Sequence, residues 1–71
     1  MNNKMPNILK ELRKEKNVTQ EEIAKEINIT QRAYAFYEKG DREPSIETLI
    51  KLAEYHKVPI DIIVGRYKKG E

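Results

Sequence analysis

The sequence predicts an all-α fold, a compact bundle of five helices. Apolar residues recur at steps of three and four in five successive segments, which is the spacing of one helical face. Residues that favour helix caps stand between those segments. No stretch shows the strict apolar–polar alternation of a half-buried strand, and no internal repeat or low-complexity segment occurs in the sequence.

The first helix is expected over about residues 6–16, after a disordered N-terminal end at residues 1–5. Its apolar stripe holds Ile8, Leu9 and Leu12. Pro6 suits a first helical position and Asn7 suits an N-cap, and the sequence alone leaves both starts open. Asn17 follows as a residue that can close the C-terminal end.

The second and third helices are expected over about residues 20–27 and 31–38, joined by a tight turn. Thr19 and Thr30 precede them as N-caps, because each hydroxyl can accept a backbone N–H at the start of a helix. Asn28 stands where the two apolar stripes change register, and Asn tolerates the positive φ that such a turn needs.

The fourth and fifth helices are expected over about residues 45–56 and 60–64, with Ser45 as a cap of the fourth. Gly40 stops the helix before them. The buried stripe of the fourth helix is expected to hold Ile46, Leu49, Ile50 and Ala53. Residues 66–71 show no periodicity and are expected to form a flexible tail.

The composition indicates one small cytoplasmic domain. A chain of 71 residues lies near the lower limit for a self-sufficient core, which favours oligomerisation. The chain has no cysteine and therefore suits a reducing compartment. No apolar run approaches the roughly 20 residues of a membrane span, and no leader for export is recognisable. The formal net charge of +2 leaves any nucleic-acid contact to a local surface.

The residue inventory argues against an enzyme. The only serine, Ser45, and the only histidine, His56, would lie on one helix about 16 Å apart. One histidine without cysteine cannot build a zinc site of the usual kinds. The chain also lacks a glycine-rich phosphate loop. We therefore expect no catalytic residue, no metal, no cofactor and no small-molecule ligand.

The expected third helix has a side suited to a DNA groove. Tyr34 and Tyr37 face the core on a helical wheel. The outward side carries Gln31, Arg32, Ala35 and Phe36. In the major groove Arg can bond guanine, Gln can bond adenine and an apolar group can meet a thymine methyl. The small Ala35 would let the helix sit deep in that groove.

Three stretches occur in a characteristic order and spacing: LRKEKNVTQEEIA, ITQRAYAFYEKGDREPS and LIKLAEYHKVPIDIIVG. Through them residues 7–65 resemble the Cro and phage-repressor-like helix-turn-helix regulators, the XRE family. The resemblance implies a lambda-repressor-like DNA-binding domain at residues 6–65. It also implies a sequence-specific transcriptional regulator of double-stranded DNA, in a bacterial or phage-infected cell.

The resemblance also implies roles for single residues. Residues at the positions of Gln31, Arg32 and Phe36 reach base edges in the family. Gln20 matches a glutamine that bonds the DNA backbone. The other candidate phosphate contacts are Thr30, Tyr34, Lys39 and Arg42; for Tyr34 a core position remains open beside this role. Arg13 and Glu38 match a pair in the family, so we expect an ion pair between the first helix and the end of the third.

A homodimer is the expected working form. Ile62 is outward-facing in the helical pattern, and the apolar patch expected around the fifth helix holds Tyr55, Ile62 and Tyr67. Two recognition helices related by a two-fold axis would read a near-palindromic operator, with half-sites about 34–36 Å apart. Repression is the default mechanism. The alternative is an antitoxin or antirepressor whose main partner is another protein, with Phe36 and Ile62 as its contacts.

Overall fold

Five α-helices make up the fold in the computed structural model, which describes residues 4–65. They are α1 (Met5–Lys16), α2 (Gln20–Glu26), α3 (Gln31–Lys39), α4 (Ile46–His56) and α5 (Ile60–Ile63). The described residues contain no strand, so the predicted all-α, five-helix fold is confirmed. None of these helices is both long and apolar enough to cross a membrane.

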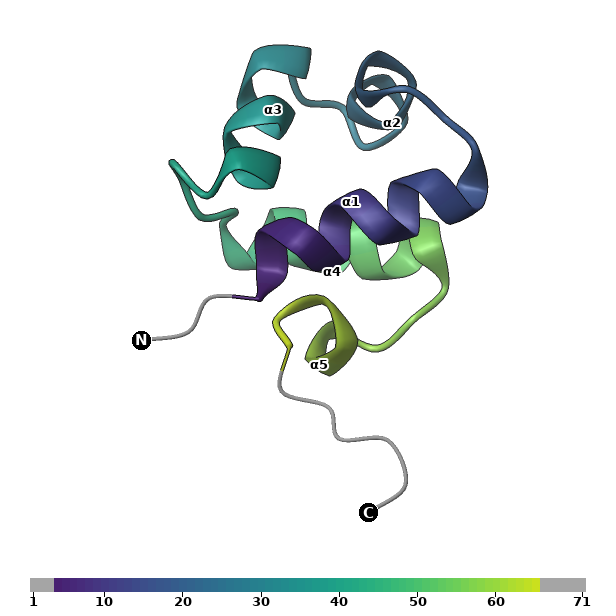
Figure 1. Cartoon of the computed structure of the whole chain (residues 1–71), viewed down its shortest axis with the longest axis vertical. Helices are drawn as coiled ribbons and strands as arrows, with labels where there is room; N and C mark the ends of the chain where they lie inside the picture. The colour runs from purple at the N-terminus through teal and green to yellow at the C-terminus, as the bar shows by residue number, and fades with distance from the viewer. Residues whose placement is uncertain (1–3, 66–71) are drawn as a thin grey trace.

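The helix-turn-helix pair lies at one end of the molecule. Figure 1 shows α2 and α3 at the top, α5 at the bottom and α1 between them. α3 packs against both α1 and α2, while α5 packs against α1 and α4. The inward side of α3 is therefore covered by two other helices, which leaves its opposite side for solvent or a ligand.

The starts of α2, α3 and α4 are capped as the sequence predicts. The Thr19 hydroxyl accepts the backbone N–H of Glu22 at 3.0 Å, and the Glu22 carboxylate accepts the N–H of Thr19 at 2.8 Å. The two bonds form a capping box. Thr30 accepts the N–H of Ala33 at 3.0 Å, and Ser45 caps α4 in the same way. Each cap satisfies a backbone donor that has no partner within its helix.

Left-handed residues close the helices and turn the chain. Asn17 ends α1 with φ 60°, and Gly40 ends α3 with φ 84°. Asn28 has φ 65° in the turn between α2 and α3, which confirms the positive φ expected there. Lys57 ends α4 with φ 58°, although a side chain makes this conformation costly. Short, sharply defined turns thus fix the angles between successive helices.

The core draws on every helix. Each of the five contributes one large side chain that is fully buried: Leu9, Ile23, Tyr34, Leu52 and Ile63. Burying a side chain of this size contributes about 1.5–3 kcal/mol relative to leaving it exposed. Because the core is small, the loss of any one of these side chains would affect all five helices together.

The expected disordered end at residues 1–5 is wrong at Met5. This residue opens α1, and with 9 % exposure it packs into the core. It stands four residues before Leu9 and so extends the same apolar stripe by one turn. Pro6 lies in the first turn, no side chain caps the helix, and Asn7 lies inside it. The sequence did not predict this helix start because no capping residue directly precedes Met5.

The expected buried stripe of α4 is shifted around the helix. Ile46 is 74 % exposed and Ile50 is 42 % exposed, whereas Leu52 and Ala53 are buried. At 100° per residue the centre of the buried side falls between Leu52 and Ala53, which leaves Ile46 and Ile50 on the flank. Several apolar residues in one helix allow more than one stripe, and packing selects among them.

Candidate nucleic-acid interface

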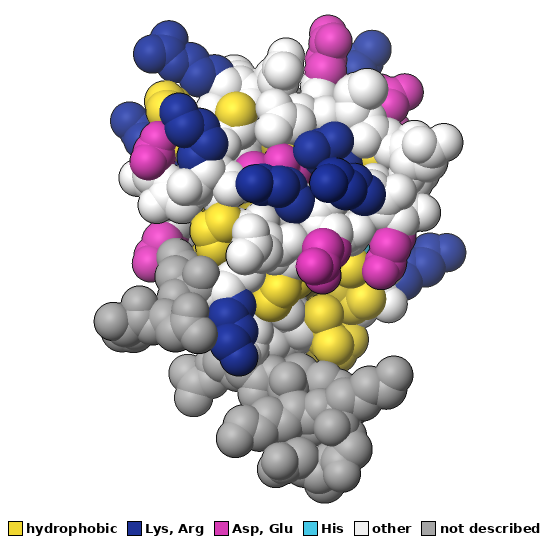
Figure 2. All heavy atoms as spheres, in the orientation of Figure 1, with side chains coloured by type: hydrophobic (Ala, Val, Ile, Leu, Met, Phe, Trp, Pro, Cys, Tyr) yellow, Lys and Arg dark blue, Asp and Glu magenta, His cyan; other side chains and the backbone are white. Residues whose placement is uncertain are grey.

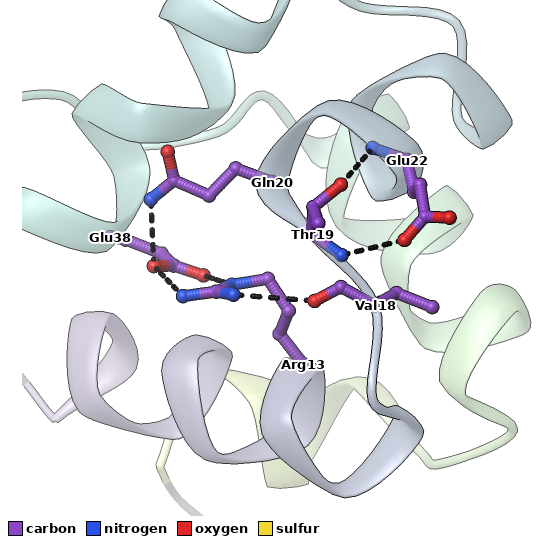
Figure 3. Close-up of polar contacts among 6 residues, drawn as sticks. All are labelled: Arg13, Val18, Thr19, Gln20, Glu22 and Glu38. Atoms are coloured by element: carbon purple, nitrogen blue, oxygen red, sulfur yellow. Dashed lines mark hydrogen bonds and ion pairs between the residues drawn. The ribbon is translucent and has the colours of Figure 1, made fainter.

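The Glu38 carboxylate of α3 links this helix to α1 and α2 (Figure 3). Arg13 of α1 donates to both oxygens of Glu38, from Nε to Oε2 at 2.7 Å and from Nη2 to Oε1 at 3.2 Å. Gln20 of α2 donates from Nε2 to Glu38 Oε1 at 3.0 Å. A third nitrogen of Arg13 reaches the carbonyl oxygen of Val18 at 3.3 Å. The ion pair expected between Arg13 and Glu38 is present, and Gln20 joins it.

The Glu38 carboxylate is buried and charged. Only 3 % of the residue is exposed, while the Arg13 side chain keeps 19 %. Burial raises the pKa of Glu38, but the hydrogen bonds from Arg13 and Gln20, the neighbouring Tyr34 hydroxyl and the Arg13 charge outweigh it. The pKa therefore lies below the usual value for Glu. A buried charge is tolerated in this position because it is paired and hydrogen-bonded.

Tyr34 belongs to the core and does not contact phosphate. The residue is fully buried, and its hydroxyl is enclosed beside the Arg13–Glu38 pair without a hydrogen bond of normal geometry. Burial raises the pKa of Tyr34, so its hydroxyl stays protonated. The expected phosphate contact through Tyr34 is therefore wrong. With 0 % of the residue exposed, Tyr34 has no surface that a phosphate could reach.

The outward side of α3 is open. Gln31 and Arg32 are exposed, and Ala35 and Phe36 are partly exposed. The buried residues of α3 are Tyr34 and Glu38, on the opposite side. All four candidate base contacts thus lie on a surface that another molecule could reach.

The Phe36 ring contacts the guanidinium groups of both Arg32 and Arg42, a pairing that the sequence did not predict. The guanidinium carbon of Arg32 lies 5.8 Å from the Phe36 ring centroid, and that of Arg42 lies 5.2 Å from it. These residues surround a shallow hollow of about 240 Å³, together with Thr30 and Ala33. The spacing of four between Arg32 and Phe36 could have suggested the first contact. The second depends on the path of the loop after α3.

Some of the candidate phosphate contacts already have a hydrogen-bond or ion-pair partner within the protein. The amide nitrogen of Gln20 is engaged with Glu38, and the Thr30 hydroxyl accepts the Ala33 N–H. The Lys39 ammonium lies 3.6 Å from the Asp41 carboxylate, with both side chains exposed. Within residues 4–65 neither Arg32 nor Arg42 is ion-paired. Figure 2 shows Lys and Arg side chains gathered over α3 and the following loop, at the upper left.

Two of the candidate dimer residues, Tyr55 and Ile62, line two separate hollows. Tyr55 is partly exposed, and the Lys16 ammonium lies 4.9 Å from its ring centroid. Ile62 lines a groove between α1 and α5, whose other residues include Ile8, Glu11, Leu12 and Glu15. Figure 2 shows apolar side chains in the lower half of the molecule, below acidic side chains. Tyr67, like the expected flexible tail at residues 66–71, lies outside the described residues.

Two capped helices joined by a left-handed Asn, with the second presenting an open polar side, define a helix-turn-helix domain of the DNA-binding type. Residues 9–63 match the family model described as "Helix-turn-helix". The chain belongs to this family, the Cro/C1-type or XRE regulators, whose members are DNA-binding transcriptional regulators and not enzymes.

Known proteins support this assignment. The chain is 41 % identical over 57 residues to the cryptic phage CTXphi transcriptional repressor RstR of Vibrio cholerae, across 80 % of this chain and 51 % of that protein. A crystal structure of a transcriptional regulator from Listeria innocua matches with a TM-score of 0.86 and 32 % identity, covering 100 % of this chain and 66 % of the other.

The solution structure of the DNA-binding domain of the P22 c2 repressor shares the fold. It matches with a TM-score of 0.82 and 22 % identity, covering 100 % of this chain and 96 % of that domain. The chain spans about half the length of the Vibrio and Bacillus curated relatives that it matches.

Proposed function

We propose that this chain reads a specific sequence of double-stranded DNA as part of a transcriptional repressor acting in the cytoplasm. One observation carries the proposal: the Glu38 carboxylate links α3 to α1 and α2 on its inward side, while Gln31 and Arg32 are exposed on its outward side. A reading helix must be held rigidly, because base recognition by hydrogen bonds needs a fixed position in the groove.

In this proposal α3 enters the major groove with its outward side against the base edges. Arg32 would bond a guanine in bidentate fashion, and Gln31 would bond an adenine. The small side chain of Ala35 would allow close approach, and the edge of the Phe36 ring would meet a thymine methyl. The exposure of Gln31 and Arg32 supports these roles.

Phosphate contacts would fix the register of α3 in the groove. Lys39 ends the helix, Arg42 follows in the next loop and Thr30 caps the helix start, so they would contact the DNA backbone on either side of the bases read. Gln20 would contribute from α2, with its side chain oriented by the hydrogen bond to Glu38. The Lys39–Asp41 ion pair is exposed, so DNA could displace the Asp41 carboxylate from it.

A homodimer would place two copies of α3 on a near-palindromic operator, about one helical turn apart. Ile62 and Tyr55 are candidates for the dimer contact, and Tyr67 remains a candidate from its place in the sequence. The groove beside Ile62 supports a contact through α5, since its lining includes the apolar side chains of Ile8 and Leu12. Occupation of the operator would block access of polymerase to a promoter.

The test is selection of bound sequences from random duplex DNA. The native chain is run beside Arg32→Ala and beside Lys10→Ala, which removes an exposed basic residue from α1. We expect a two-fold-symmetric site that Arg32→Ala loses or relaxes and Lys10→Ala retains. Each base pair read through a bidentate contact contributes about 1–3 kcal/mol of discrimination, which is enough to be seen in such a selection.

Two results would contradict the proposal. Binding that is equal for all sequences and falls steeply with salt would reduce it to backbone contact. Absence of DNA binding would favour an antitoxin or antirepressor that acts through another protein, with Phe36 and Ile62 as its contacts. The Lys10→Ala control separates a specific loss at α3 from a general effect of removing one positive charge.

A further inference from the structure

The Phe36 ring is the shared partner of the two arginines nearest to the outward side of α3. Its centroid lies 5.8 Å from the guanidinium carbon of Arg32 and 5.2 Å from that of Arg42. Both distances are within the range in which a cation is attracted to an aromatic face. The two arginines come from different elements, one from the first turn of α3 and one from the loop that follows the helix.

We propose that Phe36 is a positioning residue that couples Arg32 to Arg42, so that base reading and backbone contact strengthen each other. The inference rests on the proposed DNA-binding function. It assigns the main effect of Phe36 to the two arginines and gives any contact of its own with a base a lesser part.

The surroundings support this role because no acidic side chain competes for either arginine. Asp41 precedes Arg42 in the chain, yet its carboxylate pairs with Lys39 at 3.6 Å. Among the residues that the structure describes, no ion pair includes Arg32 or Arg42. The contact with the Phe36 ring is therefore the interaction that the two side chains share.

An aromatic partner also suits the chemistry of recognition. A carboxylate would occupy the N–H donors of a guanidinium, whereas contact with a ring leaves all five donors available at its edges. Arg32 could then bond the O6 and N7 of guanine while Arg42 bonds a phosphate. The hollow of about 240 Å³ between the two arginines, with Thr30 at one side, leaves room for such acceptors.

Coupling of this kind can be measured with a double-mutant cycle. The dissociation constant for the selected operator duplex is determined for the native chain, for Arg32→Ala, for Arg42→Ala and for the double variant. We expect the double variant to lose less affinity than the product of the single losses, by about 2- to 10-fold. Once one arginine is removed, the other is held less well and has less affinity left to lose.

The ring is tested by repeating the cycle in Phe36→Tyr and Phe36→Leu. We expect the coupling to persist in Phe36→Tyr, which keeps the aromatic face, and to vanish in Phe36→Leu, which keeps an apolar side chain without one. Thermal unfolding of each variant controls for damage to the fold. If Phe36→Leu does not fold, the native and Phe36→Tyr cycles decide the question.

Additive losses in the native background would overturn the inference, as would full coupling in Phe36→Leu. Intact coupling in Phe36→Leu with altered preference at a single base pair would identify Phe36 as a base reader instead. These outcomes leave the proposed function standing, because they require a specific operator. Failure to select any operator would remove the proposed function and this inference together.

Discussion

Glu38 joins three different helices of the fold. It accepts hydrogen bonds from Arg13 on α1 and Gln20 on α2, and it is itself a residue of α3. Removing the charge leaves Arg13 without a counterion inside the molecule. Such a loss costs about 3–5 kcal/mol when the pair is fully buried. Because the Arg13 side chain keeps 19 % exposure, water can offset part of that cost.

We therefore predict that Glu38→Gln lowers the free energy of unfolding by about 2–3 kcal/mol at neutral pH, as measured by urea denaturation. The same variant should weaken operator binding, because α3 is held less firmly. Glu54→Gln, which changes an exposed glutamate on α4, serves as the matched control and should leave both quantities nearly unchanged. Native stability and native affinity in Glu38→Gln would contradict the orienting role of the pair.

The same carboxylate sets a dependence on pH. The folded-state pKa of Glu38 is below that of the unfolded chain, which lies near the ordinary value of about 4.3. The stabilisation is thus complete above that value and is lost as the pH falls through the folded-state pKa. We expect the difference in unfolding free energy between the native chain and Glu38→Gln to shrink below about pH 4. A constant difference down to pH 2 would show that Glu38 is not preferentially ionised in the fold.

At the scale of the element, three helices end on a left-handed residue, but the residue types differ in how well they tolerate that conformation. α3 ends on Gly40 and α1 ends on Asn17, both of which tolerate a left-handed backbone. α4 ends in the same way on Lys57, whose N–H bonds to the carbonyl of Glu54 at 3.3 Å. A residue with a Cβ destabilises this conformation by roughly 1–2 kcal/mol relative to the ordinary helical one.

Lys57→Gly should therefore stabilise the fold, by up to about 1 kcal/mol after the greater chain entropy of unfolded glycine is included. Urea denaturation measures the gain. Lys51→Gly makes the same change inside α4, where glycine is unfavourable, and should destabilise by about 1 kcal/mol. If both substitutions destabilise equally, the left-handed conformation of Lys57 carries no strain that glycine can relieve.

For the whole molecule, small size is the central fact. Five helices bury one large side chain each, and α5 contributes only four residues. The groove between α1 and α5 is lined by Ile8, Leu12 and Ile62. An apolar groove on so small a domain is a natural place for a second copy to add buried surface, because oligomerisation is one way to stabilise a limited core.

We predict that Ile62→Glu abolishes dimerisation, as measured by sedimentation equilibrium at high protein concentration. The added carboxylate would stand in the groove lined by Ile8 and Leu12 and would lose hydration in a dimer. Ile46→Glu is the matched control, since Ile46 is 74 % exposed on α4 and does not line that groove. Loss of dimer in Ile46→Glu alone would move the interface to the outer side of α4.

Local chemistry made much of this fold predictable. The hydroxyls of Thr19 and Thr30 cap helices through residues three positions away, so the sequence alone identified them. Asn28 likewise adopts the positive φ that Asn tolerates better than most residues. The Arg13–Glu38 pair is different. It spans 25 positions, and only the resemblance to a known family indicated it.

The errors arose where distant parts of the chain decide the outcome. Met5 is buried because the bundle covers it, although no cap announces the start of α1. Ile46 and Ile50 are apolar but face outward, since the side of α4 that packs was selected by the other helices. The Arg42 guanidinium meets Phe36 only through the fold of a loop, so this part of the candidate interface had no local signal.

The two-sidedness of α3 has a consequence for how such a chain could acquire new targets. Tyr34 and Glu38 anchor the helix from within, while Gln31 and Arg32 are exposed on the other side. Substitutions at the exposed positions would therefore leave the buried contacts of Tyr34 and Glu38 unchanged. A few substitutions on this side could change the DNA sequence that the proposed interface recognises, at little cost in folding stability. Binding specificity and stability would then evolve at separate positions of α3.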